Sequence, residues 1–144
     1  MFLCILAVIC FLPNRAWGHC YGIGANPGFS DVPNITQLSP FRVRVSWENV
    51  VTQRECSDHF LVKYWNNDEP LNIHVSQLVG QTVDHLDIEV LPEVKYTFIV
   101  VAREIKKLFG VLWDTDDNHS KRLVFRTSYD PSKLHSILRY FPRF

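Results

Sequence analysis

From Val90 to Ala102 the chain reads Val-Leu-Pro-Glu-Val-Lys-Tyr-Thr-Phe-Ile-Val-Val-Ala. The second half of this stretch is rich in β-branched and aromatic residues, which favour strands. Pro92, in the first half, has a fixed φ and no backbone N–H, so it belongs outside a central strand. The stretch therefore predicts a turn around Pro92 that leads into a buried strand from Tyr96 to Val101.

Segments on both sides of this stretch alternate between apolar and polar residues. Every second residue from Phe41 to Trp47 is apolar, and a period of two places these residues on one buried face of a strand. Similar patterns predict strands at residues 34–38, 59–65, 71–75, 86–90 and 123–127. About seven short strands with turn residues between them predict an all-β sandwich of two packed sheets.

The composition limits the classes of protein to which the chain can belong. Its 144 residues allow one domain, and 47% hydrophobic with 21% charged residues is ordinary for a globular protein. The 15 basic and 15 acidic residues give a net charge of zero, which argues against a nucleic-acid binder.

Several short patterns, in this order and at this spacing, resemble a fibronectin type III domain over about residues 31–128. That family has a core Trp near the end of its second strand and an aromatic-x-aliphatic-x-Tyr pattern in its third. Leu-x-Pro-x-x-x-Tyr precedes its sixth strand, which continues as Tyr-x-aliphatic-x-Val-x-Ala, and its last strand often ends in Thr. The residues that match are Trp47, Phe60, Val62, Tyr64, Pro92, Tyr96, Phe98, Val100, Ala102 and Thr127, while Val90 replaces the Leu.

The resemblance implies a seven-stranded, immunoglobulin-like sandwich and assigns roles to single residues. Trp47 is expected in the core between the sheets. Tyr96 is expected to form a tyrosine corner, with a buried ring and a hydroxyl that returns to the upstream backbone.

The first residues have the pattern of a secretory signal peptide. The apolar run from Phe2 to Leu12 is shorter than the roughly 20 residues that span a bilayer, and Ala16-Trp-Gly18 fits a cleavage site. An uncleaved anchor or a short buried strand are the alternatives. We expect a signal peptide at 1–18, an extension at 19–30, the sandwich at 31–128 and a tail at 129–144. The signal peptide predicts a secreted, extracellular product, and because no later stretch is long or apolar enough to span a bilayer, that product is expected to be soluble.

Cysteine usage agrees with export. Cys4 and Cys10 lie in the predicted signal peptide, which leaves Cys20 and Cys56 for one disulfide in an oxidising compartment. Two thiols that are free or paired between molecules are the alternative. The family resemblance implies that both cysteines lie at the same end of the sandwich and can meet there.

Two sequons predict N-linked glycans in a secreted chain, at Asn34-Ile-Thr36 and Asn118-His-Ser120. Asn118 is the better candidate because a loop is expected there, whereas Asn34 falls in or beside the first strand. Unmodified asparagines are the alternative.

Motifs for catalysis, metals and cofactors are missing from the sequence. It has no His-Glu-x-x-His, Cys-x-x-Cys, Gly-x-Ser-x-Gly or phosphate-binding glycine loop. His85 and Asp87 share a strand face and can pair on the surface. The run from Asp114 to Asn118 copies the start of a calcium loop, but His119 and Phe125 replace its required Gly and Glu. We therefore expect no enzyme, no cofactor and no metal site.

The segment from Arg103 to Ser120 is long for a connection between the last two strands. It contains an apolar run with a Trp, and aromatic residues dominate the hot spots of interfaces. The predicted partner-binding residues are Leu108, Phe109, Val111, Leu112 and Trp113. As an alternative, the run extends the two strands into a longer hairpin with Gly110 at its turn, or folds over a sheet edge.

The tail mixes basic and apolar residues, which fits either a short amphipathic helix or a frayed end. Taken together, these features predict a secreted module without catalytic activity that binds an extracellular or cell-surface protein. An N-terminal or truncated module of a receptor or matrix protein is the first alternative, and an enzyme the second. The sequence carries no signal for an oligomeric state.

Overall fold

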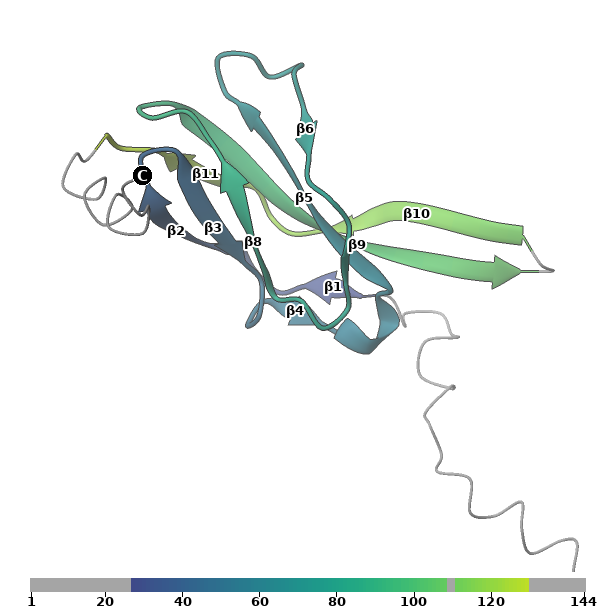
Figure 1. Cartoon of the computed structure of the whole chain (residues 1–144). Coiled ribbons are helices and arrows are strands. Elements are labelled where there is room, and N and C mark those ends of the chain that lie inside the picture. Colours follow the sequence, from purple (N-terminus) through teal and green to yellow (C-terminus); the bar gives the residue numbers. More distant parts are fainter. Residues whose placement is uncertain (1–26, 109–110, 130–144) are drawn as a thin grey trace, which may run out of the picture.

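The computed structural model describes residues 27–108 and 111–129, with the backbone alone for 104–108 and 111–117 (Figure 1). The predicted signal peptide, Cys20 and the tail from Asp130 onward lie outside the described residues. The elements are β1 (Gly28–Phe29), β2 (Asn34–Ser39), β3 (Arg42–Ser46), β4 (Val51–Thr52), the 3-10 helix η2 (Arg54–Cys56), β5 (His59–Asn66), β6 (His74–Val75), β7 (Val79–Gly80), β8 (His85–Glu89), β9 (Lys95–Leu108), β10 (Val111–His119) and β11 (Leu123–Arg126).

Two antiparallel sheets pack face to face. One has the strand order β2-β3-β8, and the other has the order β10-β9-β5-β6, with β11 also paired to β9 and β7 to β5. A small pair of β1 and β4 lies at one end. Figure 1 shows β2, β3 and β8 side by side as one layer, with β5 and β9 in the other. The predicted all-β sandwich is confirmed.

The core forms because alternate residues of facing strands are apolar. Val43 and Val45 of β3 are fully buried against Phe60 and Val62 of β5 and the inward residues of β9. Each fully buried side chain of this kind contributes roughly 1.5–3 kcal/mol.

Trp47 follows β3 directly and lies in this core, as the resemblance implied. Its side chain is fully buried, and its ring centroid is 5.7 Å from that of Phe60. Its Nε1 is buried without a hydrogen-bond partner in the described part of the chain. The ring is therefore held by packing rather than by a polar contact.

The turn between β8 and β9 is fixed by two side chains. The backbone N–H of Leu91 donates to the hydroxyl of Tyr96 at 3.1 Å, which confirms the tyrosine corner. From the other side, Thr127 Oγ1 donates to the carbonyl of Leu91 at 2.7 Å and accepts from the N–H of Val94 at 3.0 Å. Glu93 has a φ of 61°, a conformation that this turn requires.

Three apolar residues that were expected to be buried are exposed instead. Phe41 is 48% exposed because it belongs to the turn before β3, which starts only at Arg42. Leu71 is 97% and Ile73 54% exposed, and only His74–Val75 pairs with β5, so the strand predicted at 71–75 is wrong for most of its length. Within residues 27–108 and 111–129 these side chains are left uncovered, so alternation alone does not show that a strand face is buried.

The segment read as a loop between the last two strands is a hairpin. β9 runs to Leu108, and β10 returns from Val111, with register pairs from Val111↔Leu108 to His119↔Val101. The expected loop is thus wrong, and the alternative of a longer hairpin is confirmed for its backbone, while residues 109–110 lie outside the described part. Lysines and aspartates interrupt the apolar–polar alternation that would predict these strands. The backbone hydrogen bonds between the strands form regardless of these side chains.

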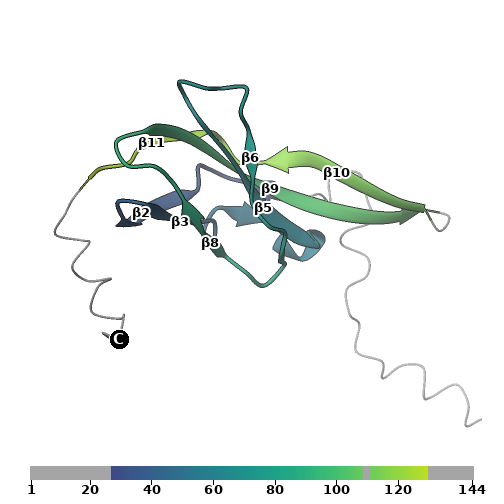
Figure 2. The ribbon, with the colours of Figure 1, turned by 45° about the horizontal axis from the view of Figure 1, so that its top comes forward.

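The outer part of this hairpin stands apart from the sandwich. Pairing of β5 with β9 ends at Arg103, so in the described residues 104–108 pair only with 111–115 of β10. We call these two stretches the ribbon. Figures 1 and 2, which view the molecule from different angles, both show β9 and β10 projecting beyond the other strands.

Thr127 should be the most sensitive polar residue of the β8–β9 turn. Thr127→Val keeps the shape of the side chain but leaves Leu91 O and Val94 N–H without their partner, which should lower the free energy of unfolding by about 1–3 kcal/mol. Urea denaturation measures this loss. The matched variant Thr52→Val, on an exposed residue of β4, should change stability by less than about 0.5 kcal/mol. Equal stability of the two variants would contradict the assigned role.

Candidate functional site

The ribbon brings most of the predicted partner-binding residues together. Leu108 stands opposite Val111, Leu112 opposite Lys107, and Trp113 opposite Lys106. Four of the five predicted residues therefore occupy adjoining positions next to the end of the hairpin, and the fifth, Phe109, lies outside the described residues.

Charged residues flank this apolar group along the ribbon. Asp114 stands opposite Ile105, and Thr115 opposite Glu104. The register then shifts between Thr115 and Asn118, where Asp116 and Asp117 fall. A bulge of this kind bends a strand and changes the direction in which its outer part leaves the sheet.

Cys56 is held in place near the β1–β4 pair, where the described chain begins. It is 6% exposed and ends η2, which is held in place because Arg54 Nη1 donates to the carbonyls of Gln81 and Val83. The first described residues lie near η2, because Gly28 of β1 pairs with Thr52 of β4, which directly precedes that helix. Cys20 lies outside the described residues, so its bond to Cys56 stays a prediction.

The two sequons differ in their surroundings. Asn34 is exposed at the first position of β2, the outer strand of its sheet. Asn118 is part of β10 rather than of a loop, is half-buried, and is followed by Ser120, whose buried Oγ accepts a hydrogen bond from Val100 N–H at 3.0 Å. The expectation of a loop at Asn118 is wrong, and Asn34 is the better placed acceptor. Glycosylation of either residue stays a prediction.

His85 and Asp87, which were expected to be able to pair with each other, make their side-chain contacts with other residues. Asp87 accepts two hydrogen bonds from the Arg44 guanidinium, at 2.7 and 3.1 Å, and His85 Nδ1 lies 2.6 Å from Asp84 Oδ1. The side-chain hydrogen bond from Arg44 lowers the pKa of Asp87, and that from His85 lowers the pKa of Asp84. Asp87 thus pairs across the strands with Arg44. Among the described residues, no group of three His, Cys, Asp or Glu side chains is arranged to hold a metal ion.

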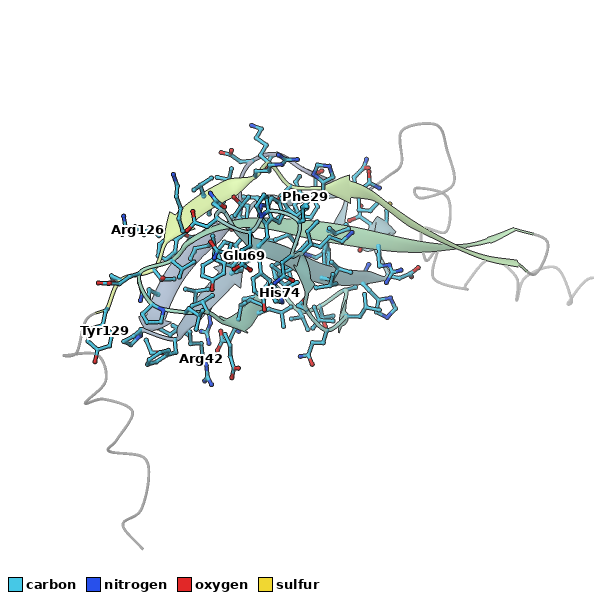
Figure 3. All side chains as sticks on the ribbon, turned by 90° about the horizontal axis from the view of Figure 1, so that it is seen from above. Phe29, Arg42, Glu69, His74, Arg126 and Tyr129 are labelled. Carbon is cyan, nitrogen blue, oxygen red and sulfur yellow. The ribbon has the colours of Figure 1, made fainter. Side chains whose placement is uncertain are left out.

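A groove of about 900 Å³ opens near the β8–β9 turn, and no sequence pattern predicted it. We call it the corner groove. It is lined by Leu38, Ser39, Phe41, Arg42, Tyr64, His74, Glu89, Val90, Leu91 and Tyr96. Arg42 and His74 are labelled in Figure 3. Its residues come from separate segments of the chain, and the sequence pattern had placed Phe41 inside a strand.

The aromatic wall of the corner groove is tightly packed. The Tyr64 ring stacks on His74 at 5.2 Å and on Phe98 at 5.8 Å between centroids. Burial raises the pKa of the Tyr64 hydroxyl, and the nearby Tyr96 and Glu89 raise it further. The groove therefore joins apolar rings to one carboxylate, Glu89, and one guanidinium, Arg42.

Comparison with known proteins gives a structural likeness only. No family model and no curated protein sequence matches the chain. The fn3 domain of human contactin 1 superposes with a TM-score of 0.54 at 17% identity, over 68% of this chain and 75% of that one. The chain has the fibronectin type III fold. The FN1–FN3 domains of chicken CNTN1 give 0.50 at 18% identity, over 69% of this chain and 32% of that one.

The sequence patterns that resemble the family fall at the end of β3 and within β5 and β9. The ribbon is an extension of the hairpin that joins the sixth strand to the last. In residues 27–108 and 111–129, no helix is long and apolar enough to cross a membrane.

The Asp87–Arg44 pair should make stability depend on acid pH. Because the pKa of folded Asp87 is lowered, its contribution is fully present above the usual Asp pKa of about 3.9 and is lost as the pH falls through the folded-state value. Asp87→Asn should be less stable than wild type at pH 7, and should lose less further stability on acidification. Urea unfolding at a series of pH values measures both effects. The exposed control Glu48→Gln should follow the wild-type profile, and parallel profiles for all three proteins would refute the coupling.

Proposed function

We propose that the chain is a secreted, extracellular fibronectin type III module without catalytic activity, which binds a protein partner through the end of its ribbon. The binding residues are Leu108, Phe109, Val111, Leu112 and Trp113. The observation that carries this proposal is the extension of β9 beyond Arg103, where its pairing with β5 stops.

The proposal rests on the physical cost of such an extension. A two-stranded ribbon is at best marginally stable in water. Among the described residues, only the ladder between β9 and β10 pairs the strands of this ribbon. Its sequence nevertheless places five apolar residues, one of them Trp, next to the turn. A partner that covers these residues would remove their apolar surface from water, and Trp is enriched in interface hot spots.

Three features support the extracellular part of the proposal. The first eighteen residues have the pattern of a signal peptide. Cys56 is buried at the end of the molecule where the described chain begins, and Asn34 is exposed on an outer strand. Each is independent of the others, and all three are expected of a protein that passes through an oxidising compartment.

A module of a larger receptor or matrix protein is the second candidate. The observation that favours it is the likeness to the FN1–FN3 domains of CNTN1, of which the chain covers 32%. In that arrangement the ribbon would contact a neighbouring domain or a separate protein by the same residues.

Intact mass spectrometry of protein from a secreting cell line tests export. The product in the medium should begin at His19, gain two hydrogens on reduction, and lose mass on deglycosylation. Asn34→Gln should remove a glycan. A chain that keeps Met1 to Gly18 inside the cell, with both thiols free, would overturn the extracellular proposal.

Substitution in the ribbon tests binding. Phe109→Ala with Trp113→Ala should weaken binding to a captured ectodomain at least about tenfold, because truncation of an aromatic hot spot costs roughly 2 kcal/mol or more. The partner is found by screening a panel of purified ectodomains by surface plasmon resonance. The urea midpoint should stay unchanged, because the ribbon lies outside the sandwich core.

The matched control replaces two exposed apolar residues elsewhere, Leu71→Ala and Val124→Ala, which are 97% and 50% exposed. This control should bind as wild type does. Unfolding of the ribbon variant would favour a structural role for the ribbon, and equal binding by both variants would refute the proposed site.

A further inference from the structure

The corner groove is an apolar site that the described chain leaves open. Its volume of about 900 Å³ lies within the roughly 300–1,000 Å³ range typical of ligand sites. Two of its apolar side chains remain substantially exposed, Phe41 by 48% and Leu91 by 62%. Apolar and aromatic side chains around a concave surface, with a few polar groups among them, are the usual lining of a ligand site.

The aromatic wall of the groove is held in place by its neighbours. Tyr64 is held between His74 and Phe98, and its ring lies 6.3 Å from that of Tyr96. Tyr96 is fixed in turn by the hydrogen bond from Leu91 N–H. Because these two rings are held by the core and the turn, they offer a preformed apolar wall to a segment that enters the groove.

The chain leaves the sandwich beside this groove. Ser128 N–H donates to Gln37 Oε1 at 3.0 Å, and Gln37 Nε2 donates to Ser128 O at 2.7 Å and to Ser39 O at 3.1 Å. Leu38 and Ser39, the next residues after Gln37, line the groove. The start of the C-terminal segment is thus tied to the strand that forms the groove wall.

The C-terminal segment has the length and chemistry to fill the groove. Ten extended residues reach roughly 35 Å, which is longer than any strand of the sandwich body. Its last residues read Tyr140-Phe-Pro-Arg-Phe144 and follow Arg139, while Asp130 is the one acidic residue of the segment. Aromatic rings match the apolar walls, and an arginine can pair with Glu89, the carboxylate that lines the groove together with the guanidinium of Arg42.

We propose that residues Tyr140–Phe144 of the same chain occupy the corner groove, with their rings against Tyr64, Val90 and Leu91 and an arginine beside Glu89. Because the segment is tethered to the sandwich, its effective concentration at the groove is in the millimolar range, so modest contacts suffice. This inference does not rest on the partner-binding role of the ribbon, which uses other residues at a different part of the fold.

Nuclear magnetic resonance of the full secreted chain tests the proposal. Cross-relaxation should connect the Phe141 ring to the methyl groups of Val90 or Leu91. Tyr140→Ser with Phe141→Ser should abolish these contacts and shift the signals of Tyr64 and Val90, while Leu78, which is 48% exposed and does not line the groove, keeps its signals. The control Leu134→Ser, in the same segment, should leave the groove signals unchanged.

A change on the groove side completes the test. Leu91→Glu should cause loss of the Phe141 contacts without unfolding, because that side chain is 62% exposed, whereas Leu71→Glu, at 97% exposure, should preserve them. Absence of the contacts in wild type, or their persistence in Leu91→Glu, would overturn the proposal. Contacts seen only between differently labelled molecules in a mixed sample would also overturn it, because the occupant would then be a second copy.

Discussion

The turn from Leu91 to Val94 connects the two sheets, and most of the structure depends on how it is held. β8 belongs to one sheet and β9 to the other, so the chain crosses between the layers here. Tyr96 fixes the turn from the start of β9, and Thr127 fixes it from the end of β11. These hydrogen bonds connect β8, β9 and β11 at one turn. They thereby fix the position of one sheet relative to the other.

β9 starts at this turn and connects it to the core and to the ribbon. Its first half pairs with β5 on one side and with β11 on the other, and it supplies Tyr96, Phe98 and Val100 to the core. Its second half leaves the sandwich and forms the ribbon with β10. The turn at the opposite end of β9 contributes Val90, Leu91 and Tyr96 to the corner groove. The two proposed contact regions therefore share one strand, but use opposite ends of it.

The sequence predicted those parts of the fold in which side-chain pattern and burial coincide. β3, β5, β8 and β11 lie close to their predicted positions because facing strands bury their alternate residues, and the tyrosine corner follows from Pro92 and Tyr96. The two-residue strands β1, β4, β6 and β7 have no pattern of their own, since pairing with a neighbour defines them. Exposure of Phe41 and Leu71 was missed because alternation does not reveal whether a second layer covers a face.

The candidate sites were likewise predicted from the sequence only in part. The apolar residues of the ribbon were found as an apolar run within a long connecting segment, and their strand pairing was foreseen only as an alternative to a loop. The corner groove was missed because its lining is assembled from separate segments that only the fold brings together.

Hydrogen exchange along β9 tests most directly whether the ribbon stands free of the sandwich. Amides from Thr97 to Arg103 pair within the sheet and should exchange at the rate of global unfolding, whereas those from Glu104 to Leu108 should exchange faster by about 100-fold or more, through local opening. Equal protection along the whole strand would show that the ribbon is packed within the domain, and would contradict its proposed role as a free contact surface.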